Sequence, residues 1–199
     1  PLHYAISVTP DAQALTFAGE AAIDIELYEA SATLTLNALD LAFAGATLTG
    51  ADGKAVPLTV ETDAAAQTAT FTAPAPLAPG RYRLTTAYTG VINTQANGLF
   101  ALDYPDKATG REVRGLFTQF EAPDARRFVP SFDEPSYKAT FDLAVTVPEG
   151  DLAVSNMPVA SETPAHGGRK KVVFRTSPKM SSYLLFFATG QFERLAAKS

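Results

Sequence analysis

Apolar and polar positions alternate with a period of two along much of this chain. Over residues 17–27 the odd positions are apolar or glycine, while Glu20, Asp24 and Glu26 fall between them. Such alternation predicts a half-buried strand with one face in water. The same pattern recurs at residues 33–36, 82–92 and 141–147.

Turn-forming dipeptides separate these runs. Asp52-Gly53, Asn97-Gly98 and Gly167-Gly168 are typical of β-hairpins, and Pro79-Gly80 is typical of a turn. Many strands at short spacing, with almost no 3.6-residue periodicity, predict an all-β fold of the antiparallel β-sandwich type with little helix.

Two segments depart from the alternation. Residues 183–188, Tyr-Leu-Leu-Phe-Phe-Ala, are continuously apolar and predict a central strand buried on both faces. Residues 123–128 are the one candidate helical turn. The chain has no internal repeat, low-complexity tract or linker, so we expect a single domain over residues 1–199.

Composition and charge exclude several classes of protein. No apolar run approaches the ~18 residues that a membrane span requires, so we expect a soluble protein without a membrane span. The chain contains no cysteine, which leaves no disulfide and no thiolate metal site and is neutral between cytoplasm and periplasm. Its net charge of −5 does not suggest nucleic-acid binding.

The residues of a self-sufficient catalytic centre are missing. The two histidines, His3 and His166, lie at opposite ends of the chain and are interpreted as ordinary surface residues. No H-E-x-x-H, G-x-S-x-G, G-x-x-x-x-G-K or G-x-G-x-x-G motif is present. We therefore expect no catalytic residue and no metal site in this chain.

Charge is concentrated in one aromatic-rich segment. Residues 111–138 hold 10 charged side chains, five basic and five acidic. Such a balanced cluster suggests partly buried ion pairs, because a buried charge is costly unless it is paired. Asp124 follows a proline and is expected to cap the turn at 125–128. Asp133 and Glu134 precede Pro135, which predicts a turn.

Gln119 and Glu121 are the candidate binding residues of this segment. They alternate at the end of a predicted strand, so their side chains should lie on the same face. An ionised carboxylate beside an amide suits an ammonium group, because it accepts strong charge-assisted hydrogen bonds. The alternative is structural: Glu121 pairs with Arg126 or Arg127 and closes the loop.

This segment resembles the signature of a known family. The match is to the N-terminal domain of aminopeptidase N-type zinc peptidases, and it extends from about residue 2 to residue 193. Ser131 departs from it, where many relatives have Cys, and so does Phe100, where they have Tyr. The matching runs are Thr118-Gln119-Phe120-Glu121, Asp124-Ala125-Arg126-Arg127, Pro130-Ser131-Phe132-Asp133-Glu134-Pro135, Asn97-Gly98-Leu99-Phe100, Ser155-Asn156-Met157-Pro158, and the segment from Met180 to Glu193.

The resemblance implies a fold and a function. The fold would be a saddle-shaped β-sandwich that precedes a catalytic domain of the same polypeptide. That domain, absent here, would bind zinc and cleave the peptide. Gln119 and Glu121 would bind the free α-amino group at the substrate's N-terminus and line the first specificity pocket.

Two other functions remain open from the sequence. The chain could be a stand-alone β-sandwich that binds protein or carbohydrate, because such folds host many functions. The absence of tryptophan argues against carbohydrate, which prefers that surface for stacking. A scaffolding domain is the third possibility.

Overall fold

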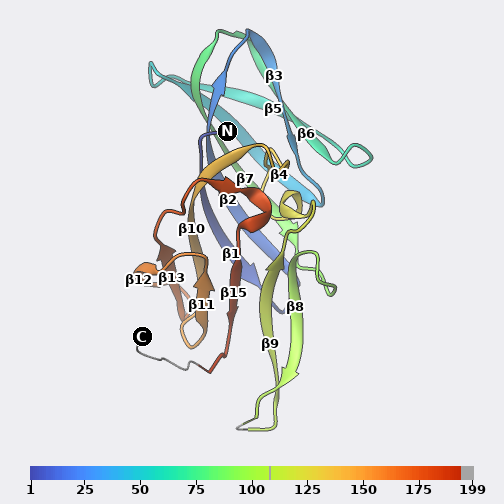
Figure 1. The fold of residues 1–199 in the computed structure, drawn as a ribbon, viewed down its shortest axis with the longest axis vertical. Coiled ribbons are helices and arrows are strands. Elements are labelled where there is room, and N and C mark those ends of the chain that lie inside the picture. The colour runs from blue at the N-terminus through green and yellow to red at the C-terminus, as the bar shows by residue number, and fades with distance from the viewer. Residues whose placement is uncertain (108, 194–199) are drawn as a thin grey trace.

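The computed structural model describes residues 1–107 and 109–193, and nearly all of the regular structure in it is strand (Figure 1). Two single turns of 3-10 helix complete the elements, η1 (Ala125–Arg127) and η2 (Ser182–Leu184). The prediction of an all-β fold with little helix is confirmed for these residues.

One large sheet contains eleven strands. They are β1 (His3–Asp11), β2 (Thr16–Leu27), β3 (Ser31–Asn37), β4 (Leu41–Gly50), β5 (Ala55–Asp63), β6 (Thr68–Leu77), β7 (Gly80–Val91), β10 (Lys138–Pro148), β12 (Val159–Ala165), β13 (Arg169–Phe174) and β14 (Met180–Ser181). Their order across the sheet is β12-β13-β10-β1-β2-β7-β4-β5-β6-β3, and β14 pairs with β10.

A second sheet of four strands lies beside the large one, in the lower half of Figure 1. In the order β11-β15-β9-β8, it contains β8 (Gly98–Pro105), β9 (Glu112–Gln119), β11 (Leu152–Ser155) and β15 (Phe187–Gly190).

A single hydrophobic core joins the two sheets. The predicted alternation is visible in β10, where Phe141, Leu143 and Val145 are buried and the residues between them are partly exposed. The same cluster of buried side chains includes Leu116 and Phe187 of the small sheet. One contiguous core of this kind is what a single domain requires.

Aromatic contacts extend this core under the charged segment. The ring of Phe128 lies 5.6 Å from Phe17 of β2 and 5.3 Å from Phe120 at the end of β9. Both Phe120 and Phe128 are buried. The aromatic side chains therefore fix the segment after β9 to the large sheet.

The turn predictions are mostly confirmed. Asp52-Gly53 connects the paired strands β4 and β5, and Gly167-Gly168 connects β12 and β13. Asn97-Gly98 was predicted as a hairpin, and that prediction is wrong, because β7 and β8 belong to different sheets. Gly98 nevertheless has φ +63°, a conformation that favours glycine.

Two further expectations need correction. The sheet is not antiparallel throughout, because β1 and β10 pair in parallel. Residues 183–188 do not form one central strand: η2 occupies Ser182–Leu184 and β15 begins at Phe187. Leu184 and Phe186 are 48% and 38% exposed, so only one face of this apolar segment is covered by the described residues.

Candidate functional site

Gln119 and Glu121 lie where β9 leaves the small sheet. Gln119 is the last residue of β9 and pairs with Gly98 of β8. Both Gln119 and Glu121 are exposed, while Phe120 between them is buried. The two side chains therefore continue the alternation of the strand and share its outward side. The Gln119 amide nitrogen donates to the main-chain carbonyl of Glu121 at 3.2 Å.

The Glu121 carboxylate has no hydrogen-bond or ion-pair partner within residues 1–107 and 109–193. Both arginines that could have neutralised it are bound to other acids: Arg126 pairs with Asp133, and Arg127 pairs with Asp124 and Asp40. The alternative in which Glu121 closes the loop through an arginine is therefore wrong. The carboxylate is exposed and available to a ligand.

Arg127 fixes the loop that follows Glu121. Its Nε donates to Asp124 at 2.8 Å, and its Nη1 donates to Asp40 in the turn between β3 and β4. Asp124 occupies the predicted capping position of η1, but its side chain makes no capping hydrogen bond. That prediction is wrong, because the guanidinium of Arg127 takes the carboxylate instead.

Asp133 is the buried acid of the same segment, and only 5% of its surface is exposed. Its Oδ2 accepts from the Nε of Arg126 at 3.0 Å, and its Oδ1 accepts from the hydroxyl of Ser182 at 2.7 Å. Arg126 also donates to the Gln67 side chain at 3.1 Å. The network satisfies both charges, as burial of an ion pair requires, and it links the segment to η2.

The turn after Asp133 forms as predicted, and it leads into β10. The Tyr137 amide donates to the carbonyl of Glu134 at 3.0 Å. Just before it, the Phe132 amide donates to the buried hydroxyl of Tyr4 at 3.1 Å, and burial raises the pKa of that phenol. The neighbouring Ser131 is fully buried, and its hydroxyl has no partner among the described residues.

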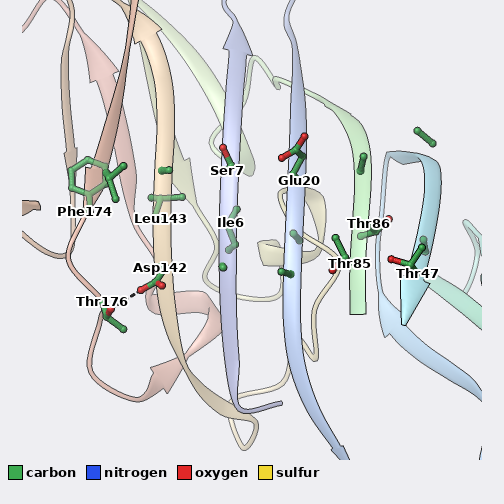
Figure 2. A pocket seen from close by; sticks show the side chains of 18 of the residues that line it. Ile6, Ser7, Glu20, Thr47, Thr85, Thr86, Asp142, Leu143, Phe174 and Thr176 are labelled. Atoms are coloured by element: carbon green, nitrogen blue, oxygen red, sulfur yellow. Dashed lines mark hydrogen bonds between the residues drawn. The ribbon is translucent and has the colours of Figure 1, made fainter. Parts of the chain in front are cut away.

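A large cavity lies elsewhere in the described part of the chain. It measures about 1140 Å³ and crosses β1, β2, β7 and β10 of the large sheet. Figure 2 shows Ser7, Glu20, Thr85 and Asp142 along it, with Phe174 at one side. No residue of the segment 117–138 lines this cavity. It offers mostly small side chains and no grouping of catalytic residues.

The two histidines lie in different parts of the fold. The Nδ1 of His3 lies 2.7 Å from the Thr140 hydroxyl, and its Nε2 lies 3.2 Å from Asp142. His166 is exposed in the hairpin turn after β12. Over residues 1–107 and 109–193, no group of three or more His, Cys, Asp or Glu side chains could hold a metal ion. Within the same ranges, no helix is long and apolar enough to cross a membrane.

Comparison with known proteins agrees with the motif. A family model described as the peptidase M1 N-terminal domain matches residues 1–184, and the chain belongs to this family. It is 39% identical over its whole length to an aminopeptidase N of Acetobacter pasteurianus and to a puromycin-sensitive aminopeptidase of Caenorhabditis elegans. It is 37% identical over 97% of its length to aminopeptidase M1-B of Oryza sativa subsp. japonica.

The chain spans only part of each of these relatives. It covers 55% of the Acetobacter protein, 21% of the Caenorhabditis protein and 22% of the rice protein. The relatives therefore contain polypeptide that has no counterpart in these 199 residues.

Proposed function

We propose that this chain is the N-terminal domain of a zinc-dependent aminopeptidase that removes single residues from the N-terminus of peptides. Gln119 and Glu121 bind the free α-amino group of the substrate and contribute to the pocket for its first side chain. The observation that carries this proposal is the exposed carboxylate of Glu121, which has no partner in the described chain although two arginines lie within six residues of it.

A carboxylate in this position suits an ammonium ligand. Hydrogen bonds between ionised groups are shorter and roughly twice as strong as neutral ones. Gln119 is already directed toward the backbone of Glu121 by its own hydrogen bond. Because the loop is fixed by Arg127 and Asp133, little conformational entropy is lost on binding. Holding the terminal ammonium sets the register of the peptide, so only the first residue is presented for cleavage.

The chemistry of bond cleavage would come from outside this chain. The side chains described here do not fit a zinc site, because His3 meets only Thr140 and Asp142 and His166 lies alone in a turn. In the proposed enzyme, zinc is held by a catalytic domain of the same polypeptide. We therefore expect the isolated 199-residue chain to hydrolyse no peptide, with or without added zinc.

Kinetics of the full-length enzyme test the proposal. Glu121→Ala should raise KM and lower kcat/KM for an aminoacyl anilide. Glu112→Ala is the matched control, because Glu112 is an exposed glutamate at the opposite end of β9. Unchanged kcat/KM in Glu121→Ala, or an equal loss in both variants, would remove the amine-binding role.

A further inference from the structure

Arg127 connects the loop that carries Glu121 to a distant turn of the large sheet. Asp40 lies in the turn between β3 and β4, 87 positions before Arg127, and its carboxylate accepts a hydrogen bond from Nη1 of Arg127. In Figure 1 this turn lies close to the turn of η1. The Nε of the same guanidinium donates to Asp124 at 2.8 Å. One arginine is therefore held between two acids that belong to different parts of the fold.

The aliphatic part of Arg127 contacts the strand pairing at Gln119. Gly98 pairs with Gln119 across β8 and β9 and has φ +63°. A Cβ atom on Gly98 would lie only 2.9 Å from the Cβ of Arg127, so the arginine packs directly against the glycine backbone. This close approach requires glycine at position 98. Arg127 thus touches the strand end at Gln119 as well as the loop that follows Glu121.

Main-chain hydrogen bonds join Arg127 to the turn that contains Glu121. The Asp124 amide donates to the carbonyl of Phe120 at 3.0 Å, and the Arg127 amide donates to the carbonyl of Asp124 at 3.1 Å. Glu121 lies inside the first of these two consecutive turns. A displacement of Arg127 would therefore be passed through Asp124 to the backbone that directs the Glu121 carboxylate.

The turn that presents Asp40 is itself fixed. Asp40 has φ +57°, a left-handed conformation that aspartate adopts more readily than most residues. The amide of the preceding Leu39 donates to the carbonyl of Arg126 at 3.0 Å. The side chain of Arg127 is only 22% exposed, so its charge needs these acidic partners. Asp40 therefore offers the guanidinium a carboxylate at a defined position.

We propose that Asp40 is a positioning residue of the amine-binding site and acts through Arg127. Asp40 does not itself bind the substrate. By holding the guanidinium, it keeps the turn at residues 120–124 in one arrangement, so that Glu121 binds the ammonium group with little loss of conformational entropy. The inference rests on the proposed function of Glu121, and it adds a residue of the large sheet to a site that lies at the end of the small one.

Two variants remove this contact without straining the backbone. Asp40→Gly deletes the carboxylate, and glycine adopts φ +57° without a steric penalty. Asp40→Asn removes the charge but keeps an oxygen that can accept from Arg127. Asp103→Asn is the matched control, because Asp103 also accepts from an arginine, Arg114, at 2.6 Å. That ion pair lies toward the opposite end of β8 and β9 from Gln119.

Inhibition of the full-length enzyme by an amino acid amide, and by its analogue without the amino group, tests the inference. Asp40→Gly should weaken inhibition by the amide about 3- to 5-fold, the range of an exposed ion pair, and leave the analogue unchanged. Asp40→Asn should fall between wild type and Asp40→Gly, and Asp103→Asn should match wild type.

A purely structural role of Asp40 gives a different result. Partial unfolding lowers the fraction of active enzyme, which reduces the apparent kcat but leaves both inhibition constants unchanged. That result, or equal weakening of the two ligands by Asp40→Gly, would overturn the inference. An equal effect of Asp40→Asn and Asp103→Asn on inhibition by the amide would overturn it as well.

A double-mutant cycle tests whether Asp40 acts through Glu121. In enzyme that already carries Glu121→Ala, adding Asp40→Gly should weaken inhibition by the amide no further. Additive losses would show that the two residues act separately, and the inference would be wrong.

The failure of the inference and the failure of the proposed function give different results. If Glu121→Ala weakens inhibition by the amide but Asp40→Gly does not, the amine-binding role stands and the positioning role of Asp40 is overturned. If Glu121→Ala leaves inhibition by the amide unchanged, the proposed function fails, and the positioning role fails with it.

Discussion

Gln119 bonds to the main chain of Glu121 and leaves the glutamate carboxylate free of partners in the described residues. The 3.2 Å hydrogen bond joins the strand end to the loop through the backbone carbonyl, so the two side chains are held on one side without neutralising the charge. Around them, every arginine of the segment 117–138 is paired with an aspartate. A site that is prepared to receive a cation needs this combination of a fixed backbone and an unpaired acid.

The buried network around Asp133 should dominate the stability of the segment. Asp133→Ala is expected to lower the free energy of unfolding by about 3–5 kcal/mol, because it leaves the Arg126 charge buried without a partner. Urea unfolding of the 199-residue chain measures the effect. Glu134→Ala is the control at the adjacent exposed position and should change the free energy of unfolding by less than about 0.5 kcal/mol. An equal change in the free energy of unfolding for Asp133→Ala and Glu134→Ala would show that Arg126 finds another partner.

At position 131, a thiol should stabilise the fold more than the hydroxyl of Ser131 does. Its side chain is fully buried and unpartnered in the described structure. A free cysteine behaves as a small hydrophobic residue, so Ser131→Cys is expected to raise the free energy of unfolding by about 1 kcal/mol. Thermal unfolding under reducing conditions measures the change. A decrease would indicate that the Ser131 hydroxyl is satisfied by an ordered water.

The pair of Asp24 and Arg83 should make stability depend on pH at the acid end. Arg83 donates to both carboxylate oxygens, at 2.6 and 2.8 Å, and these bonds lower the pKa of Asp24 below its ordinary value of 3.8. A folded pKa below the unfolded one stabilises the protein above the unfolded pKa, and this stabilisation is lost as pH falls through the folded pKa.

Asp24→Asn should therefore lower the free energy of unfolding at neutral pH by no more than about 1 kcal/mol, because the pair is partly exposed. The difference from wild type should shrink as the pH drops below 3.8. Urea unfolding at a series of pH values measures it. A difference that stays constant down to acid pH would show that the ion pair is not its cause.

Local patterns in the sequence predicted the strands well, because the period of two depends only on neighbouring residues. The strands at 17–27, 82–92 and 141–147 all form. The parallel pairing of β1 with β10 could not be predicted, since it joins positions more than 130 residues apart and leaves no trace in either strand.

The hydrogen-bond partners of Arg127 and Asp133 were not predicted, for the same reason. Asp40 and Ser182 bind Arg127 and Asp133, but they are separated from them by 87 and 49 positions. The one available signal for Ser182 was a polar residue at the start of an apolar run. Gln119 and Glu121 could be singled out because their alternation is local, and the resemblance of the surrounding motif supplied a role for them.

The apolar run at 183–188 shows a different limit of prediction from sequence, which concerns burial. Its composition predicts burial on both faces, and the described chain buries only one. Composition alone therefore does not say which faces of an apolar segment the fold covers. The exposed side chains of Leu184 and Phe186 are the part of this segment that its composition did not predict.

The amine-binding claim is tested most directly by comparing two ligands of the full-length enzyme. One is an amino acid amide, and the other is its analogue without the amino group. Glu121→Ala should weaken inhibition by the amine-bearing ligand by about 10- to 100-fold, the range of one hydrogen bond between charged groups, and leave the analogue unchanged. Equal weakening of both ligands, or of neither, would contradict the account.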